Sequence, residues 1–203
     1  MRSNLRFIFL LLVVLMLAAG CSSAPKVQRT AVEETIDLSG RWNDSDSRMV
    51  ADEMIKDCLN RPWLAEFQSE KGRKPLVIVG TVLNRSDEHI DTSVFVKDLE
   101  RGLVNSGLVD FVASRDERGE LRQERADMQL GFTSAETAKE MGREFGADFM
   151  LKGTLNSVRD QIKGQYVILY QVNLEIHDLE TNRKRWIGQK KLKKLVSRSR
   201  WKP

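Results

Sequence analysis

Apolar side chains occupy every second position from Tyr166 to Ile176, and this pattern restricts the fold of the chain more than any other. Successive side chains of a β-strand point to opposite faces of a sheet, so the spacing predicts a strand with one buried face. The buried face would carry Tyr166, Ile168, Tyr170, Val172, Leu174 and Ile176, and the other face Gln165, Gln171, Asn173, Glu175 and His177.

Turn residues stand on both sides of this strand. Lys163-Gly164 favours a hairpin with a preceding strand over 147–158, and Thr181-Asn182 favours a second hairpin. The final strand would contain Trp186, Ile187, Leu192, Leu195 and Val196. The last third of the chain is therefore predicted to form an antiparallel meander of three strands.

A second constraint comes from residues 74–112. The apolar run Leu76–Val79 is typical of a strand that is covered on both faces. An amphipathic helix follows, with Val96, Leu99 and Leu103 on one face, Asp91 or Thr92 as its cap and Gly107 after its end. Phe111-Val112 supplies the next strand, so this part of the chain predicts one right-handed βαβ unit.

Three further helices are indicated by capping residues and apolar periodicity. The first is capped by Asp44, Ser45 or Asp46, and it would bury Val50, Ala51, Met54, Ile55 and Cys58. The second runs from the capping box Ser114–Glu117 to Asp127 and would lie mostly in water. The third begins at the capping box Thr133–Glu136 and stops at Gly146, and it would bury Ala138, Met141 and Phe145. The expected fold is α/β, with a single mixed sheet, one βαβ unit, additional helices and the C-terminal meander.

The N-terminus has the features of an export signal. Arg2 and Arg6 precede an uncharged run, 7–20, which is too short for a spanning helix of about 20 residues. The run ends in small residues before Cys21, as in bacterial lipoprotein signals, where the Cys becomes the acylated first residue of the mature chain. We therefore expect a signal peptide over 1–20 and a lipid anchor at Cys21, which would hold the protein on a membrane without spanning it.

The segment after Cys21 is predicted to be a linker. Residues 21–43 are polar and lack a sustained apolar period, so we place the globular domain at 44–203, with a basic C-terminal tail. Its part from Ser22 to Leu38, fully extended at about 3.3 Å per residue, would reach about 55 Å. Within the linker, Arg41 and Trp42 either cover the core as a lid or present a partner contact.

Cysteine and charge narrow the possible functions. Cys58 is the only thiol left once Cys21 is acylated, so no intramolecular disulfide is expected, and its helical position predicts a buried, unreactive side chain. Residues 183–203 hold ten Lys or Arg and no Asp or Glu. This basic strip would either meet an anionic partner, such as a lipid surface or an acidic protein, or protect an exposed edge strand. Nucleic acid is not an expected partner, because the signal directs the chain out of the cytoplasm.

The sequence contains no glycine-rich phosphate loop after the first strand and no HExxH, CxxC or GxSxG motif. The one dense group of titratable residues beside a strand end is Asp87, Glu88, His89 and Asp91. It would be either a metal or acid/base site or a solvated loop in which Asp91 caps a helix. We expect the second, and hence no catalytic residue, metal, cofactor or small-molecule substrate.

The same loop is a candidate contact surface. A charged loop that leaves a buried strand has a rigid base, and such loops often bind partners. Arg and Trp are also enriched among interface hot spots. We therefore predict that Arg41, Trp42, Arg85, Glu88 and His89 contact a partner protein.

Four blocks of the sequence resemble the LpoB family, the lipoprotein activators of bifunctional penicillin-binding proteins. They are GRWNDSDSRMVADEMI at 40–55, VGTVLNRSDEHIDTSVF at 79–95, ADFMLKGTL at 147–155 and YQVNLEIHDLETNRKRW at 170–186. The resemblance implies a domain similar to the N-terminal domain of TolB. It also implies a non-catalytic role, in which a palmitoylated lipoprotein of the outer membrane reaches through peptidoglycan and activates a class A penicillin-binding protein.

Two other functions stay open. One is an envelope enzyme, such as a peptidoglycan hydrolase that uses Glu88 or Asp91, and the other is a structural lipoprotein that assembles envelope complexes. The linker is also much shorter than in the best-known members of the family, so its reach across the periplasm is the feature in which this chain departs from them.

Overall fold

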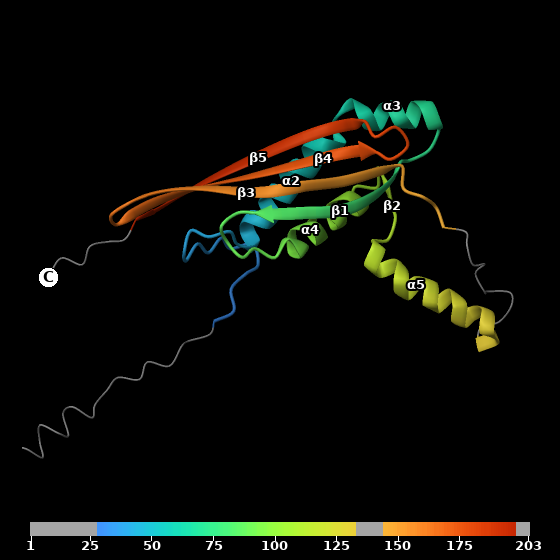
Figure 1. Ribbon diagram of the computed structural model, residues 1–203, viewed down its shortest axis with the longest axis horizontal. Coiled ribbons are helices and arrows are strands. Elements are labelled where there is room, and N and C mark those ends of the chain that lie inside the picture. Colours follow the sequence, from blue (N-terminus) through green and yellow to red (C-terminus); the bar gives the residue numbers. More distant parts are fainter. Residues whose placement is uncertain (1–27, 133–143, 198–203) are drawn as a thin grey trace, which may run out of the picture. The chain divides into compact units, whose positions relative to one another are not determined.

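The computed structural model describes residues 28–132 and 144–197 (Figure 1). The helices and strands belong to a compact unit that begins at Thr35. In chain order they are α2 (Asp44–Leu59), α3 (Pro62–Lys71), β1 (Leu76–Arg85), α4 (Thr92–Asn105), β2 (Asp110–Phe111), α5 (Arg115–Asp127), a π-helical turn (Met128–Phe132), β3 (Phe149–Ile162), β4 (Gln165–Asp178) and β5 (Lys184–Ser197). None of the described helices is long and apolar enough to cross a membrane.

The five strands form one mixed sheet in the order β2-β1-β3-β4-β5. Strand β1 pairs in parallel with both β2 and β3, while β3, β4 and β5 are antiparallel to their neighbours. The predicted α/β class, the βαβ unit (β1-α4-β2) and the C-terminal meander are thus confirmed. The central strand of the sheet is β3, and β2 pairs with only the first two residues of β1.

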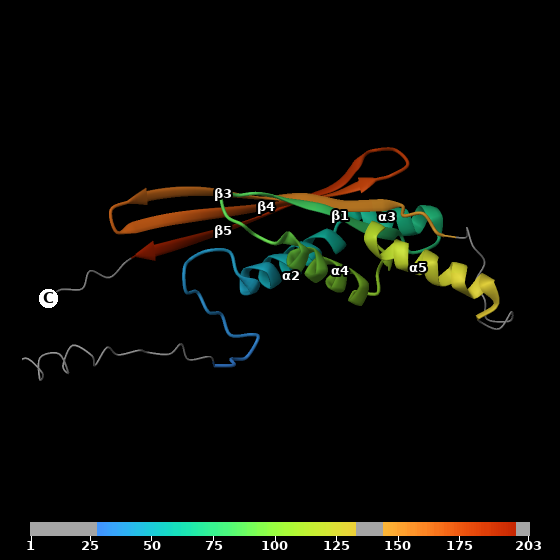
Figure 2. The ribbon, with the colours of Figure 1, turned by 60° about the horizontal axis from the view of Figure 1, so that its bottom comes forward.

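The core lies between one face of the sheet and the helices α2 and α4, which Figure 2 shows on the same side of the strands. The alternation in β4 is as predicted, because Ile168, Tyr170, Val172, Leu174 and Ile176 are all buried on that face. From α4 come Phe95, Leu99 and Leu103, and from α2 come Val50, Ala51, Met54, Ile55 and Cys58. The amphipathic patterns of α2 and β4 therefore identified their buried faces. In α4 the prediction is right for Leu99 and Leu103, but it missed the buried Phe95 and included Val96, which is only half-buried.

The opposite face of the sheet is largely open. The predicted run Leu76–Val79 is buried or half-buried, but the rest of β1 is open on this face, since Thr81 is exposed and Leu83 is 47% exposed. In β5, Ile187 and Leu195 lie on this open face and are exposed, whereas Trp186 and Leu192 face the core. A strand alternates regardless of residue chemistry, so the apolar residues of β5 cannot all be buried.

The helix ends follow local hydrogen bonding. The cap of α2 is Asn43, not Asp44, Ser45 or Asp46, because Asn43 and Asp46 bind each other's backbone N–H in a capping box. Asp91 caps α4 by accepting from the backbone N–H of Ser93. Ser114 and Glu117 form the predicted box at α5, whose remaining residues are mostly exposed.

One helix was missed and one expected helix cannot be assessed. Helix α3 begins with Pro62, ends at Gly72 in the left-handed conformation, and buries Trp63, Leu64 and Phe67. The helix expected from Thr133 to Gly146 lies almost wholly outside the described residues. Phe145, which is described, lies outside any helix and is 80% exposed, so its predicted place in the core is wrong.

Candidate functional site

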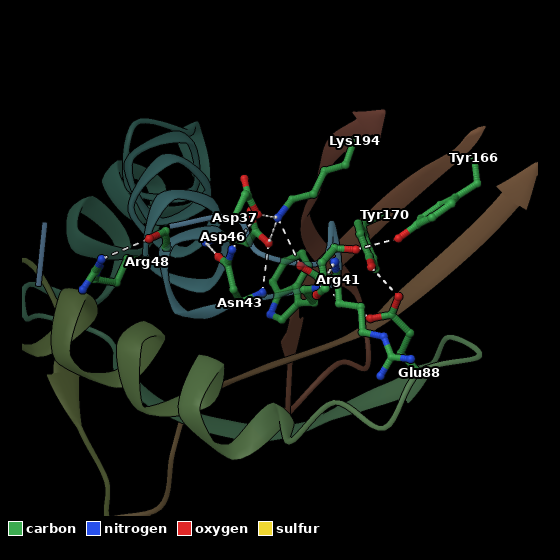
Figure 3. Close-up of polar contacts among 12 residues, drawn as sticks. Asp37, Arg41, Asn43, Asp46, Arg48, Glu88, Tyr166, Tyr170 and Lys194 are labelled. Atoms are coloured by element: carbon green, nitrogen blue, oxygen red, sulfur yellow. Dashed lines mark hydrogen bonds and ion pairs between the residues drawn. The ribbon is translucent and has the colours of Figure 1, made fainter. Parts of the chain in front are cut away.

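The predicted contact loop, residues 85–89, continues to Asp91 and lies beside a segment that we call the N-terminal strap, residues 37–43. The strap is the last part of the predicted linker; it leads into α2 and lies against β4, β5 and the contact loop (Figure 3). Gly40 allows this close approach, because its φ of 70° favours glycine and a Cβ there would collide with Val196. The strap is therefore part of the folded domain.

Trp42 closes the core beneath the strap. Its ring makes edge contacts with Tyr170 and Phe95, at centroid distances of 5.5 and 6.3 Å. Its indole N–H donates a hydrogen bond of 2.8 Å to the Ser47 hydroxyl. Both the apolar body and the polar edge of Trp42 are thus satisfied inside the domain, which supports the interpretation of Trp42 as a lid.

Glu88 is bound from two sides. One carboxylate oxygen accepts a 2.6 Å hydrogen bond from the phenol of Tyr170, and the other accepts a 3.3 Å bond from the backbone N–H of Trp42. Burial and the neighbouring Glu88 carboxylate raise the pKa of Tyr170, so the phenol stays protonated and donates. Glu88 therefore joins the contact loop to the strap and to β4.

The other acidic residues of the loop also have structural partners. Asp87 accepts a 2.6 Å bond from the hydroxyl of Ser157 in β3, which lowers the pKa of Asp87. Asp91 is occupied as the cap of α4, and its hydrogen bonds to Ser93 lower its pKa as well. Across residues 28–132 and 144–197, no three His, Cys, Asp or Glu side chains gather as a metal site would need.

Three of the predicted contact residues present their side chains to solvent. Arg41, Arg85 and His89 are all exposed. Arg41 stands between two surface hollows, one of ≈ 290 Å³ shared with His89 and one of ≈ 570 Å³ shared with Tyr166. The structure thus brings four of the five predicted residues around the strap, while Arg85 lies at the end of β1 and pairs with Asn156 of β3.

Lys194 is the residue at this site that the sequence did not indicate. Its ammonium donates to Asp46 at 2.6 Å, to Asp37 at 2.7 Å and to the carbonyl of Arg41 at 3.2 Å (Figure 3). Both ends of the main pair are buried, with 9% of the Lys194 side chain and 6% of the Asp46 side chain exposed. The strand pattern could have indicated it: Lys194 is an even number of positions from Trp186 and Leu192 along β5, so its side chain lies on the same, inward face as theirs.

The basic strip divides into two faces of β5. On the inner face Lys190 pairs with Glu53 of α2, and Lys194 pairs with Asp46. On the outer face Lys191 and Lys193 are exposed, and within the part of the chain that the structure describes they form no ion pair. Lys190 and Lys194 thus form ion pairs within the domain, whereas the exposed Lys191 and Lys193 can contact a partner.

The structure describes only one of the two cysteines, Cys58. Cys21 lies outside the described residues. Cys58 is 2% exposed, and burial raises the pKa of its thiol to about 12. A thiol in that environment is protonated at neutral pH and unreactive.

Comparison with known proteins gave one family and several structures. A family model described as "Peptidoglycan-synthase activator LpoB" matches residues 46–192. The LpoB C-terminal domain from Salmonella enterica is 15% identical, with 72% of this chain and 98% of that chain covered and a TM-score of 0.43. The NMR structure of E. coli LpoB is 16% identical, with 89% and 85% covered and a TM-score of 0.42. Lipoprotein GNA1162 from Neisseria meningitidis is 16% identical, with 63% and 88% covered and a TM-score of 0.38. The comparison with curated proteins gave no match.

Proposed function

Because this chain belongs to the LpoB family of peptidoglycan-synthase activators, we propose that it is a lipoprotein that binds and activates a bifunctional, class A penicillin-binding protein. The observation that carries the proposal is the extent of the family match. Residues 46–192 include β1 to β4, most of β5, and nearly all of α2 and α4, the two helices that cover the core. The shared part is thus most of the folded domain.

The proposed anchor is Cys21, acylated after removal of residues 1–20. Ser22 follows the Cys, and by the usual sorting pattern this residue permits an outer-membrane anchor, with the domain in the periplasm. Cys21 is sixteen residues from Asp37, the first strap residue that binds the sheet. At about 3.3 Å per residue the domain can move at most about 55 Å from its membrane, so the synthase must present its binding surface within that reach.

A non-catalytic role is supported by the state of the acidic loop. A hydrolase would need a pair of carboxylates around a substrate. Glu88 is instead bound to Tyr170 and Trp42, and Asp91 is bound to the first turn of α4. These hydrogen bonds give both carboxylates a role in stabilising the fold.

The proposed contact residues are the exposed cations of the site, Arg41 and Arg85, together with His89. Trp42 and Glu88 position these residues, because their contacts hold the strap against the loop. Exposed charges on a rigid base mainly set the orientation and rate of association.

The experiment is a glycan-polymerisation assay with a purified class A penicillin-binding protein, lipid II and the full-length lipidated chain. We expect the chain to bind the synthase and to raise its polymerisation rate, while the chain alone forms and cleaves no glycan. Arg85→Glu should weaken binding about tenfold or more, whereas Asp52→Asn on the exposed side of α2 should leave it unchanged. A chain that neither binds nor stimulates, or that itself releases muropeptides, would refute the proposal.

A further inference from the structure

The outer face of the sheet carries an apolar cluster where the strands extend past the helices. Figures 1 and 2 both show the β3–β4 and β5 end of the sheet projecting beyond α2 and α4. On this projection Val158, Ile162 and Leu195 are 66%, 73% and 69% exposed. We call this surface the outer hairpin face, with Arg85, Val158, Ile162, Lys191, Lys193 and Leu195 as its defining residues.

The strand register gathers these side chains on one surface. Val158 lies opposite Leu169, which in turn lies opposite Lys193. In the next row outward, Val167 lies between Asp160 and Leu195. Directly opposed residues of neighbouring strands are close enough to touch, so Val158 with Leu169 and Val167 with Leu195 form two apolar pairs in successive rows. Ile162 lies on the same face, one row further out and opposite Gln165.

A cationic rim borders this patch. Arg85 of β1, Asn156 of β3, Gln171 of β4 and Lys191 of β5 form one row across the sheet. The row therefore has a cation at each end and neutral amides between them. Lys191 and Lys193 also differ from Lys190 and Lys194, whose charges are neutralised by Glu53 and Asp46 on the inner face.

Exposed apolar patches on soluble domains mark interaction sites, and an apolar centre with a charged rim is typical of a protein interface. We infer that the outer hairpin face is the surface that docks the synthase, and that it fits an apolar protein surface bordered by carboxylates. This inference rests on the proposed function. It places the main contact on the side of the sheet opposite the strap, with Arg85 as the residue shared with the predicted loop.

The observations favour a protein over a lipid surface. Asp160 lies within the patch, on the same face as Val158 and Ile162. Its charge would oppose anionic lipid, and burying it in a bilayer without a partner would be costly. The amides of Asn156 and Gln171 likewise gain hydrogen bonds from a protein partner but not from acyl chains.

The test compares two substitutions in the full-length lipidated chain. Leu195→Asp places a charge in the patch, and Val104→Asp places one at an exposed position of α4, 49% exposed, away from this face. Binding to the purified class A penicillin-binding protein is measured together with the glycan-polymerisation rate. We expect Leu195→Asp to weaken binding at least tenfold and to remove stimulation, and Val104→Asp to behave as the wild type. Lys191→Glu with Lys193→Glu should weaken binding too, and more at low salt than at high salt.

The outcomes separate this inference from the proposed function. If the wild type neither binds nor stimulates, the proposed function fails and the inference fails with it. If the wild type binds and Leu195→Asp binds equally well, only the inference fails, and loss of binding in Arg41→Glu would then assign the contact to the strap side. Thermal unfolding of each variant checks that the fold is intact. If Leu195→Asp instead reduces flotation of the Cys21→Ser chain with phosphatidylglycerol vesicles and leaves synthase binding unchanged, the face binds lipid and the inference is overturned.

Discussion

The phenol of Tyr170 donates a 2.6 Å hydrogen bond to the carboxylate of Glu88, across 82 residues of sequence. Tyr170 is fully buried in β4, and Glu88 lies in the loop between β1 and α4. This bond, with the one from Trp42 to the same carboxylate, closes the domain where the strap enters. It turns an acidic loop residue into a stabilising element.

We predict that Glu88→Ala lowers the free energy of unfolding by about 1–3 kcal/mol, because it leaves the buried Tyr170 hydroxyl without its acceptor. Tyr170→Phe should cost less, since it removes the donor as well as its need for a partner. Urea unfolding of both variants and of the double variant gives the coupling between them. His89→Ala, at the neighbouring exposed position, is the control and should change stability by less than about 0.5 kcal/mol. Additive losses for the two substitutions would contradict the bond.

Lys194→Met should destabilise the domain by roughly 3 kcal/mol, because Asp46 would remain buried without its cation. Lys193→Met is the matched control, one position away on the exposed face, and should be nearly neutral in unfolding experiments. Equal stability of the two variants would mean that the pair between Lys194 and Asp46 does not form in solution.

Asp148 should make the domain sensitive to acid. Burial alone would raise the pKa of this carboxyl, but the Arg73 guanidinium at 2.7 Å and the Leu76 backbone N–H at 2.8 Å bring it below its ordinary value. A lowered pKa in the folded state means that the stabilisation is present above about pH 4 and is lost as the pH falls further. Urea unfolding between pH 7 and pH 3 should therefore show Asp148→Asn less stable than wild type at pH 7, with the two converging at low pH. Asp52→Asn, at an exposed position of α2, should follow the wild type throughout, and a constant gap for Asp148→Asn would speak against the proposed charge effect.

Cys58 should react slowly with thiol reagents in the native protein. Its side chain is 2% exposed and burial raises the pKa of the thiol to about 12, so neither access nor ionisation favours reaction. Labelling with a bulky reagent at pH 8 should require denaturant, and Cys58→Ala should cost about 1–2 kcal/mol without loss of synthase stimulation. Rapid labelling of the folded chain would contradict the buried position.

Cys21→Ala should abolish lipid attachment. No other thiol lies near the end of the predicted signal, and Cys58 is buried. Metabolic labelling with a palmitate analogue, followed by membrane fractionation, measures both acylation and anchoring. Label that persists on the variant would disprove the assignment.

The sequence predicted the parts of the fold that depend on local periodicity. Period-two burial identified β4, and helical spacing identified Leu99 and Leu103 of α4, although it selected the half-buried Val96 in place of the buried Phe95. Helix α3 carried readable end signals, Pro62 and Gly72, but its ten residues lie between two stronger elements. The site was harder to predict, because the partners of Glu88 and Lys194 are Tyr170 and Asp46, which are far away in the chain. From the sequence alone, a lysine that points into the domain cannot be distinguished from an exposed one, because its carboxylate partner is not known.

The attachment of the strap determines how the domain would respond to being pulled. Ser39 accepts a hydrogen bond from the Tyr166 phenol, and Asp37 pairs with Lys194, so tension along the preceding chain first reaches the folded unit at β4 and β5. If a partner holds the outer hairpin face, which shares β5 with the strap contacts, force between membrane and synthase would enter and leave the domain at this end of the sheet. The end that contains α3 and β2 would then experience none of that force, and mechanical unfolding would begin with release of the strap from Lys194.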